Sequence, residues 1–336
     1  MQAPKQMNKW TDIVNCIKEA ERVVIMTHTN MDGDAIGSAL ALCHAVRSLG
    51  KRCVILIEDD IPGYLKFMHD HSGHEGDPFF VRSMPFEPEL ALVVDCGDSG
   101  RIEKRLAVFE SCRTKVCVDH HMQVGSFADH SVIEPEASAT GLLVYELIKE
   151  LGVTINKEIA EDLYVAILTD TGCFKYSNTT AECHIVTAEL YKYGIEHEKL
   201  ATLIYDTLDM AQIKLEAAIV DWMEVFADGK AVISYVTQEQ LKKLGASYDM
   251  TGSCIDVLRK IAGVEVCAFL KEHEDGSYKL SLRSKGAVDV NRVAVKLGGG
   301  GHVKASGATL EVSLPEALSK TKAAVEEELA RSLKNG

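Results

Sequence analysis

Aspartates and histidines lie at or just after the ends of three apolar segments in the first half of the sequence. They are His28, Asp32 and Asp34 at the first segment, Asp95 at the second, and Asp119, His120 and His121 at the third. A single Asp after a strand is usually a helix cap or a turn former. Three such groups in one chain exceed what capping explains, and their residue types are those of metal ligands.

The elements around these residues predict how they would be brought together. Apolar runs at 21–28, 52–57, 90–95 and 114–119 predict buried strands, and the stretches 35–49, 138–151 and 157–169 predict helices. This alternation predicts a parallel sheet with helices on both faces. The carboxyl ends of such strands share one edge, where ligands bind. We therefore expect four acids and three histidines to meet there.

So many negative charges at one edge need cations to hold them. Carboxylate oxygens with a minority of imidazoles suit Mn²⁺ or Mg²⁺, and the ligands are not those of a thiolate-rich zinc site. Two such ions, about 3.5–4 Å apart, can share a bridging carboxylate and make hydroxide available for attack on a phosphate. The pattern predicts a two-metal phosphate ester hydrolase.

Two motifs carry a family resemblance. The segments His28-Thr-Asn-Met-Asp32-Gly-Asp34 and Asp119-His120-His121 resemble the signature motifs of the DHH phosphoesterase superfamily. Asp95, in VVDCGD, and Asp170, in LTDTGCF, match the positions of two further aspartates in that superfamily, one at a strand end and one at a helix end.

The resemblance implies a role for each of these residues. It implies two divalent cations, with Mn²⁺ preferred and Mg²⁺ or another first-row metal as alternatives. One ion would lie on His28, Asp32 and Asp95, and the other on Asp34, Asp95, His120 and Asp170. Asp95 would bridge the two ions, Asp119 would orient a histidine, and His121 would face the substrate phosphate as a catalytic residue.

A second group of residues near the C-terminus suits an anion. It consists of Arg283, which ends an apolar strand, and of Gly298, Gly299, Gly300, Gly301 and His302, which follow one another. Either part alone would be a flexible loop or a solvated side chain. Together, a guanidinium and a run of backbone N–H groups can hold a phosphate. They resemble the DHHA1 substrate-binding domain, whose GGGH-type loop and Arg bind a nucleotide phosphate.

The chain length and the element pattern predict an α/β protein with two domains. We expect a parallel-sheet DHH catalytic domain over 10–180, a helical connector over 181–226 and a smaller α/β DHHA1 domain over 227–335. Strands at 231–236, 264–270 and 278–283 and a last helix at 315–333 define the second domain.

Composition limits the partners. The net charge is −14 and no basic stripe is present, so a protein that tracks long nucleic acid or a duplex is not expected. No apolar run is long enough to span a membrane, and the N-terminus lacks a secretory signal. The ten cysteines show no CxxC pattern, which is typical of reduced thiols in a cytoplasmic protein.

Within the superfamily, the length and the domain pairing are most similar to the bacterial nanoRNases, the oligoribonuclease and pAp phosphatase group. This resemblance implies substrates such as RNAs of two to five nucleotides, linear pApA and adenosine 3′,5′-bisphosphate. Three alternatives stay open: a cyclic-di-AMP phosphodiesterase, a pyrophosphatase or exopolyphosphatase, and a catalytically inactive nucleotide sensor. The oligomeric state, including a homodimer, is also left open.

Overall fold

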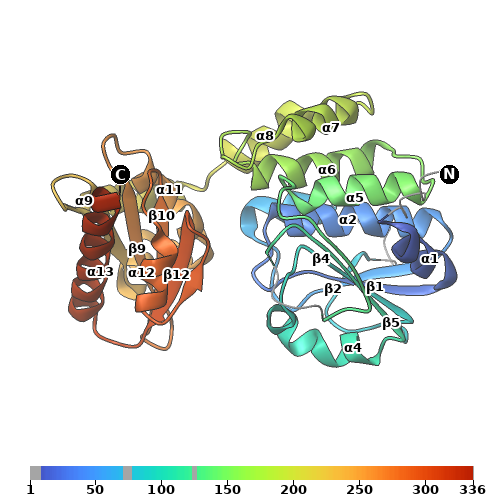
Figure 1. The fold of residues 1–336 in the computed structure, drawn as a ribbon, viewed down its shortest axis with the longest axis horizontal. Helices are drawn as coiled ribbons and strands as arrows, with labels where there is room; N and C mark the ends of the chain where they lie inside the picture. Colours follow the sequence, from blue (N-terminus) through green and yellow to red (C-terminus); the bar gives the residue numbers. More distant parts are fainter. Residues whose placement is uncertain (1–8, 71–77, 123–126, 336) are drawn as a thin grey trace. The chain divides into compact units, whose positions relative to one another are not determined.

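The structure is a computed structural model that describes residues 9–70, 78–122 and 127–335. The chain divides into two compact units, Met1–Thr207 and Leu208–Gly336 (Figure 1). Within the described residues, no helix is long and apolar enough to cross a membrane. We call the two parts unit 1 and unit 2 and describe each by itself.

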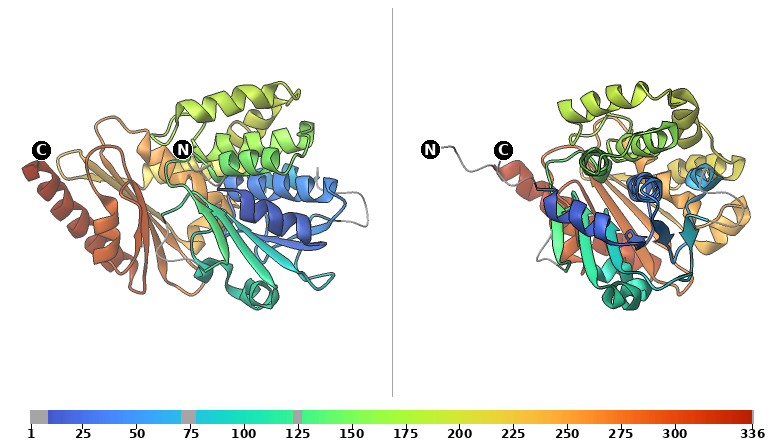
Figure 2. Two further views of the ribbon diagram at one scale, coloured as in Figure 1. Left: turned by 45° about the vertical axis from the view of Figure 1, so that its right-hand side comes forward. Right: turned by 90° about the vertical axis from the view of Figure 1, so that its right-hand side faces the viewer.

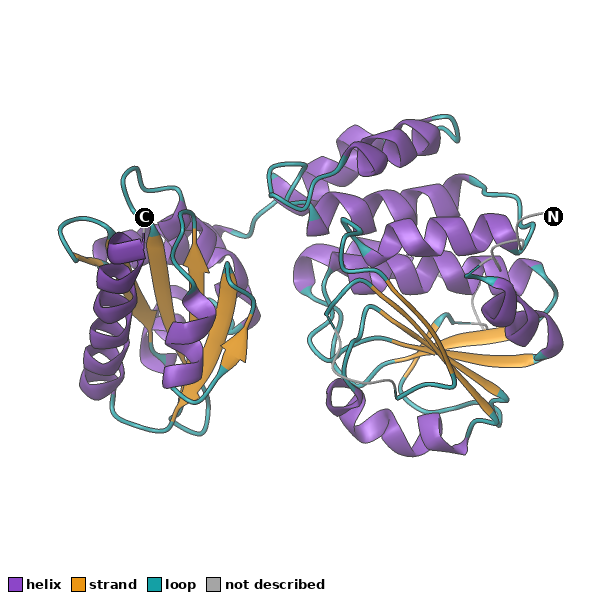
Figure 3. Ribbon diagram, in the orientation of Figure 1, coloured by secondary structure: helices purple, strands orange, loops and turns teal. Residues whose placement is uncertain are grey.

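Unit 1 is built on a six-stranded sheet whose strands all run parallel (Figure 3). Its strands are β1 (Arg22–Met26), β2 (Arg52–Leu56), β3 (Phe80–Val81), β4 (Leu90–Val94), β5 (Thr114–Asp119) and β6 (His130–Ile133). Their order across the sheet is β3-β2-β1-β4-β5-β6. The chain reverses its direction of winding between β1 and β4, which is the point where open α/β sheets bind ligands.

Helices cover both faces of this sheet, as the sequence predicted. The helices of unit 1 are α1 (Thr11–Glu19), α2 (Gly33–Ser48), α3 (Lys66–Asp70), α4 (Leu106–Ser111), α5 (Thr140–Glu150), α6 (Lys157–Asp170), α7 (Ala181–Tyr191) and α8 (His197–Tyr205), with 3₁₀ turns at Gly63–Leu65 and Ser99–Arg105. The main core joins α1, α2, α5 and α6 to one face. A smaller core joins α4 and the Ser99–Arg105 turn to the other face (Figure 2).

Helices α2 and α6 pack very closely, and glycines make this possible. A Cβ at Gly37 would lie 2.4 Å from the carbonyl oxygen of Asp162, and a Cβ at Gly33 would lie 2.4 Å from Oγ1 of Thr169. Real side chains cannot approach so closely, so any larger residue would push the two helices apart. The close approach brings the first turn of α2 against the last turn of α6, where two predicted metal ligands lie.

Unit 2 has a mixed six-stranded sheet in the order β11-β12-β10-β9-β8-β7. Its strands are β7 (Glu224–Phe226), β8 (Ala231–Val236), β9 (Val266–Glu272), β10 (Tyr278–Ser284), β11 (Gly300–Gly301) and β12 (Ala305–Leu310). Only the pair β8–β9 is parallel within this sheet. Its helices are α9 (Met210–Asp221), α10 (Gln238–Leu244), α11 (Cys254–Arg259), α12 (Val290–Lys296) and α13 (Leu314–Asn335), with a 3₁₀ turn at Asp249–Ser253.

Each face of this second sheet has its own core. One core joins α12 and α13 to strands β8, β9, β10 and β12. The other joins α9, α10 and α11 to β8 and β9. Of the helices in the stretch 181–226 that we predict as a connector, α7 and α8 lie in unit 1 and α9 lies in unit 2.

Candidate metal centre

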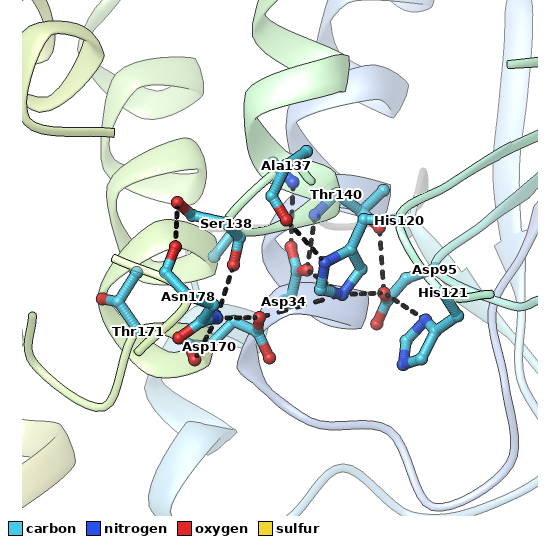
Figure 4. A network of polar contacts seen from close by, with 12 residues as sticks. Asp34, Asp95, His120, His121, Ala137, Ser138, Thr140, Asp170, Thr171 and Asn178 are labelled. Carbon is cyan, nitrogen blue, oxygen red and sulfur yellow. Dashed lines mark hydrogen bonds and ion pairs between the residues drawn. The ribbon is translucent and has the colours of Figure 1, made fainter. Parts of the chain in front are cut away.

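The predicted acids and histidines of unit 1 meet at the carboxyl edge of the sheet, beside the reversal between β1 and β4. Their ligand atoms form three groups in which all atoms lie within 4.8 Å of one another. The groups are His28, Asp32 and Asp95; Asp34, His120 and Asp170; and Asp95, His120 and His121. Figure 4 shows the residues of the last two groups. Asp95 and His120 each belong to two of these groups.

His28 presents one ring nitrogen to two carboxylates. Its Nδ1 lies 2.7 Å from the carbonyl oxygen of Thr29, which can only accept a hydrogen bond, so Nδ1 carries a proton. The other nitrogen, Nε2, lies 3.4 Å from Oδ2 of Asp95 and 3.7 Å from Oδ2 of Asp32. A backbone carbonyl that fixes the tautomer in this way is the usual partner of a metal-binding histidine.

His120 is oriented in the same way on the other side of Asp95. Its Nδ1 donates to the carbonyl of Ala137 at 3.1 Å. Its Nε2 lies 3.7 Å from one oxygen each of Asp34, Asp95 and Asp170 (Figure 4). The two histidines therefore turn equivalent nitrogens towards a carboxylate that lies between them.

These spacings fit divalent metal ions. Atoms that bind one ion at about 2.1 Å lie about 3.0–3.4 Å apart around it. The observed separations of 3.4–3.7 Å need only a small closing movement to match that arrangement. Oxygen donors with a minority of imidazole nitrogens suit Mn²⁺ or Mg²⁺. The six predicted ligands thus form groups able to hold metal ions.

The electrostatics of the site also call for cations. Burial, together with the charges of Asp95 and Asp170, raises the pKa of Asp34 well above its ordinary value. Burial likewise raises the pKa of Asp170 to about 6, although His120 opposes this. Burial disfavours the charged form of His28, but Asp32 and Asp95 outweigh it and raise the pKa of the imidazole to about 10. Without metal ions, protons must neutralise part of this cluster.

The N-terminus of α5 holds two of the ligands in place. Asp34 accepts the backbone N–H of Thr140 at 2.7 Å and that of Gly141 at 2.9 Å, and Ser38 donates to it from the next turn of α2 at 3.0 Å. Oγ1 of Thr140 donates to Oδ1 of Asp95 at 2.9 Å. From sequence alone, this segment is simply the start of a helix. Its hydrogen bonds also fix the carboxylates that the histidines face.

A second link from the same segment reaches Asp170. Nδ2 of Asn178 donates to Oδ2 of Asp170 at 3.0 Å and to the carbonyl of Ser138 at 2.9 Å. Oγ of Ser138 donates in return to the carbonyl of Asn178 at 2.6 Å (Figure 4). Asp34, Asp95 and Asp170 are therefore all tied to residues 138–141. Sequence reasoning missed Asn178, because nothing in its neighbourhood marks it as a partner of Ser138.

Asp119 and His121 form a pair beside the metal ligands. Oδ1 of Asp119, which is fully buried, accepts Nδ1–H of His121 at 2.8 Å and the backbone N–H groups of His120 and His121. Burial disfavours protonation of His121, but its hydrogen bond to Asp119 and the charge of Asp95 raise its pKa. Nδ1 of His121 lies 3.6 Å from Oδ1 of Asp95. His121 can thus hold a proton close to the ligand cluster.

We expect Asp95 to be the last residue of its strand, but it lies one residue beyond the end. Strand β4 stops at Val94, and Asp95 adopts a left-handed conformation with φ of 55°. Aspartate tolerates this conformation better than most residues. The turn points its carboxylate to the reversal point of the sheet, between His28 and His120.

The segment after Asp170 makes an unusual turn. Gly172, Cys173 and Phe174 all have positive φ, between 55° and 61°. The ring of Tyr176 packs directly on Gly172, where an added Cβ would lie 2.3–2.6 Å from ring atoms. An aromatic residue so close to the ligands could either receive a base or belong to the core. Phe174 is partly buried against the main core, and its ring stacks on that of His184 with 5.1 Å between the ring centres.

The predicted anion-binding residues lie together within unit 2. Arg283 on β10 is paired with Ala305 on β12. The backbone N–H of His302 donates to the carbonyl of Ala305 at 2.7 Å, so His302 and Arg283 flank the same residue.

The first two N–H groups of the glycine run donate hydrogen bonds within the chain. Gly298 donates to the carbonyl of Val295 at 3.1 Å and Gly299 to that of Ala294 at 2.8 Å, because both close the end of α12. Gly299 is needed for another reason: a Cβ there would lie 2.1 Å from the carbonyl oxygen of Gly307 on β12. The run of glycines lets a short strand, β11, lie against β12.

Comparison with known proteins agrees with this geometry. The DHH family N-terminal domain matches residues 22–167, and the DHHA1 domain matches residues 228–331. A protein of Thermus thermophilus named bifunctional oligoribonuclease and PAP phosphatase NrnA is 34% identical over 98% of this chain and 97% of its own. The protein of the same name from Bacillus subtilis is 27% identical, over 89% and 93%.

A solved structure has the same fold throughout. It is an exopolyphosphatase-related protein from Bacteroides fragilis, which matches with a TM-score of 0.88 and 27% identity over 97% of this chain and 98% of its own. The DHH match contains both signature motifs, and the DHHA1 match contains Arg283 and the loop that ends at His302. The chain belongs to the DHH family of metal-dependent phosphoesterases and combines a DHH domain with a DHHA1 domain.

Proposed function

We propose that this chain hydrolyses short oligoribonucleotides, linear dinucleotides such as pApA, and adenosine 3′,5′-bisphosphate, with two divalent cations of which Mn²⁺ is preferred. The observation that carries this proposal is the place of Asp95. One oxygen lies 3.4 Å from Nε2 of His28 and the other 3.7 Å from Nε2 of His120, so one carboxylate faces both groups of ligands. A shared carboxylate is what a two-ion phosphoesterase requires. The names of the relatives supply the substrate class.

The distances support the division of ligands that the family resemblance implies. His28, Asp32 and Asp95 would hold one ion, and Asp34, Asp95, His120 and Asp170 would hold the other. When bound, the ions supply a nucleophile from water and neutralise charge on the attacked phosphoryl group. Thr140 and Asn178 hold the carboxylates still, so little reorganisation is needed during the reaction.

His121 is the acid in this proposal. Asp119 accepts its Nδ1–H, and this hydrogen bond raises the pKa of the imidazole and favours its protonated form. The side chain is about 29% exposed, and because Asp119 takes Nδ1, Nε2 is the nitrogen that would meet the substrate. A proton passed from Nε2 to the leaving oxygen would let the product alcohol depart as a neutral group.

The residues of unit 2 would bind the other phosphate of the substrate. Arg283 offers a planar donor fork for a phosphate, and His302 and the loop Gly298–Gly301 lie beside the same strand. Few basic residues are needed for a substrate of this size, in agreement with the net charge of −14. Long single strands, duplexes and membranes are not expected partners. All ten cysteines are in the thiol form and none is in a disulfide, which fits a cytoplasmic location.

A product time course tests the proposal. The purified chain with Mn²⁺ is given pAp, pApA, a pentamer and a 24-mer RNA, cyclic di-AMP, pyrophosphate and polyphosphate in separate reactions. We expect pApA, the pentamer and pAp to be hydrolysed, and the 24-mer to react much more slowly. The polyphosphate reaction is included because of the name of the Bacteroides fragilis structure.

The other outcomes would each replace the proposal with a different function. Hydrolysis of cyclic di-AMP ahead of pApA would indicate a cyclic dinucleotide phosphodiesterase. Turnover of polyphosphate or pyrophosphate alone would indicate an enzyme for inorganic anions. A folded chain that binds no divalent ion and turns over none of these compounds would be a nucleotide sensor.

A further inference from the structure

One face of the unit 2 sheet is packed by helices mainly at β8 and β9, and α11 also reaches β10. On β8 and β9 this face carries Val232, Phe269 and other apolar residues, which pack under α9, α10 and α11. The opposite face is covered by α12 and α13 (Figure 1). The positions on β10 and β12 that continue the first face belong to neither core. We call this region the open half-sheet. Its residues are Lys271, Lys279, Ser281, Arg283, Ala305, Gly307 and Thr309.

Two lysines of the open half-sheet lie directly opposite each other. Lys271 on β9 is paired with Lys279 on β10 in antiparallel register. Side chains in such a pair start about 4.5–5.5 Å apart at Cβ, and like charges there destabilise the sheet. Arg283 lies on the same face of β10, four residues further along the strand. Three cations thus share one face with no acid between them on either strand.

These cations lack acidic partners among the residues that the structure describes. Arg283 donates only to the carbonyl of Leu282, at 3.0 Å. Lys271 is half-buried, with Nζ 5.2 Å from the centre of the Tyr248 ring. Burial, and then the charges of Lys279 and Arg283, lower the pKa of Lys271 to about 8. The three cations repel one another, so a bound anion would stabilise their charged forms.

The surface beside the cations suits an extended anion. Ser281 lies between Lys279 and Arg283, and Thr309 is paired with Lys279, so hydroxyl donors accompany the charges. Gly307 and Ala305 are paired with Ser281 and Arg283 on β12, so the side chains beside these two residues are small. Lys279 and Arg283 are roughly 13 Å apart along the strand. That span is too long for one phosphate and suits separate phosphates of one nucleotide chain.

We infer that Lys271 and Lys279 form a second phosphate subsite on the open half-sheet, in addition to the one at Arg283. This second subsite binds the backbone of oligonucleotides of three or more residues. The inference rests on the proposed function for the identity of the ligand. The chain would then have a short basic surface for phosphodiesters, although its net charge is negative. A substrate as small as pAp would occupy the Arg283 subsite and leave the lysines free.

The test measures binding separately from hydrolysis. The full chain in EDTA is titrated into 5′-fluorescein-labelled penta-adenylate, and fluorescence anisotropy gives Kd at several salt concentrations. Wild type is compared with the double variant Lys271→Gln/Lys279→Gln. The control is Lys320→Gln, a change on α13 at the opposite face, where Lys320 is paired with Glu316 at 2.7 Å. Thermal melting checks that each variant is folded.

We expect the double variant to bind the pentamer about tenfold more weakly, with a salt slope smaller by about 0.7 for each phosphate that it no longer binds. The control should bind like wild type, and pAp should compete equally well with all three proteins. A double variant with the Kd and salt slope of wild type would overturn the inference, even if wild type hydrolyses RNA. If wild type hydrolyses no RNA but the double variant still binds the pentamer more weakly, the subsite stands and the proposed function fails.

Discussion

The two units of this chain carry charge in opposite ways. Residues 1–207 contain 32 Asp and Glu against 19 Lys and Arg, whereas residues 208–336 contain 18 against 17. In unit 1, buried carboxylates face one another at the sheet edge. In unit 2, Lys271, Lys279 and Arg283 share one face of the sheet. We propose that unit 1 holds cations and unit 2 holds anions, because hydrolysis of a nucleotide with metal ions needs both abilities.

The strongest way to break this comparison is to remove the shared carboxylate of unit 1. Asp95→Asn should lower kcat on pApA at least about a thousandfold, about 4 kcal/mol in the barrier, because both ligand groups lose a member. Metal content by mass spectrometry should fall together with kcat. Binding of labelled penta-adenylate in EDTA should not change, since it belongs to unit 2.

A matched control lies in the same loop. Asp98→Asn keeps the cap on the N–H of Gly100, which the Asp98 carboxylate accepts at 2.9 Å, and it touches no predicted ligand group. It should leave kcat and metal content close to wild type. Near-native turnover of a folded Asp95→Asn protein would show that Asp95 is not shared.

A smaller effect is expected from the hydroxyl that supports Asp95. Thr140→Ala removes the 2.9 Å hydrogen bond to Asp95 and keeps the backbone N–H that Asp34 accepts. Removal of such a supporting hydrogen bond typically weakens metal binding about 10–100-fold. Isothermal titration with Mn²⁺ measures this directly. Thr140→Ser retains the hydroxyl and should restore most of the affinity; equal reductions in both variants would mean that the hydrogen bond is not what matters.

The corresponding change in unit 2 should act on binding. Arg283→Ala should raise KM for pApA about 10–100-fold, the scale of a charged hydrogen bond of about 1.5–3 kcal/mol, with little change in kcat. Hydrolysis of a small chromogenic phosphodiester should change little. Arg292→Ala on α12, where Arg292 is paired with Asp289 at 3.2 Å, is the control. Equal effects on both substrates would place Arg283 in the chemistry instead of in substrate binding.

The smallest effect is expected at a buried acid of unit 1, Asp162, which belongs to none of the predicted ligand groups. Asp162 on α6 is 6% exposed; its Oδ2 lies 3.7 Å from Nε2 of His44 and accepts no hydrogen bond from the described residues. Burial, and then the charges of Glu161 and Glu158, raise its pKa well above the ordinary value. A folded-state pKa above the unfolded one means that stability is lost as pH rises past the unfolded value.

Asp162→Asn should therefore raise the melting temperature of the metal-free protein. The gain should be about 2–6 °C at pH 8 and smaller at pH 4.5, because burial resists ionisation of the folded side chain, whereas ionisation of the unfolded carboxyl, whose pKa is about 3.9, favours unfolding more strongly as pH rises. Glu110→Gln, an exposed change on α4, should show no such pH dependence. If Asp162→Asn changed the melting temperature by the same amount at both pH values, the raised pKa of Asp162 would be contradicted.

The strands of unit 1 could be predicted because most are buried on both faces and read as continuous apolar runs. Leu90–Val94 is buried at every position, for example. Two edge strands escaped prediction. Phe80–Val81 is only two residues long, and in His130–Ile133 only Val132 is buried. An edge strand with one covered face leaves too weak a pattern to distinguish from a loop.

The place of the predicted metal ligands in the fold could be expected from the sequence, because each lies at a strand or helix end. Their supporting partners could not. The hydrogen bonds from Thr140 and Gly141 to Asp34 cross more than a hundred residues and exist only because α5 packs beside α2. The close approach of α2 and α6 depends on Gly33 and Gly37, which in the sequence look like ordinary small residues of a helix start.

The same limit applies to unit 2. Arg283 can be identified from its place at a strand end, but Lys271 and Lys279 lie eight residues apart on two strands and become a pair only through their register. A basic site of this kind leaves no stripe in the sequence, because each lysine is separated from the next by residues of the other face.

The central claim is that Asp95 serves two metal ions at once, and a crystal structure grown with Mn²⁺ tests it most directly. Anomalous scattering at the manganese edge locates and counts the ions without reference to activity. We predict two sites per chain, about 3.5–4 Å apart, with His28 and Asp32 on one, Asp34, His120 and Asp170 on the other, and Asp95 touching both. A single manganese site, or two sites of which Asp95 binds only one, would contradict this claim.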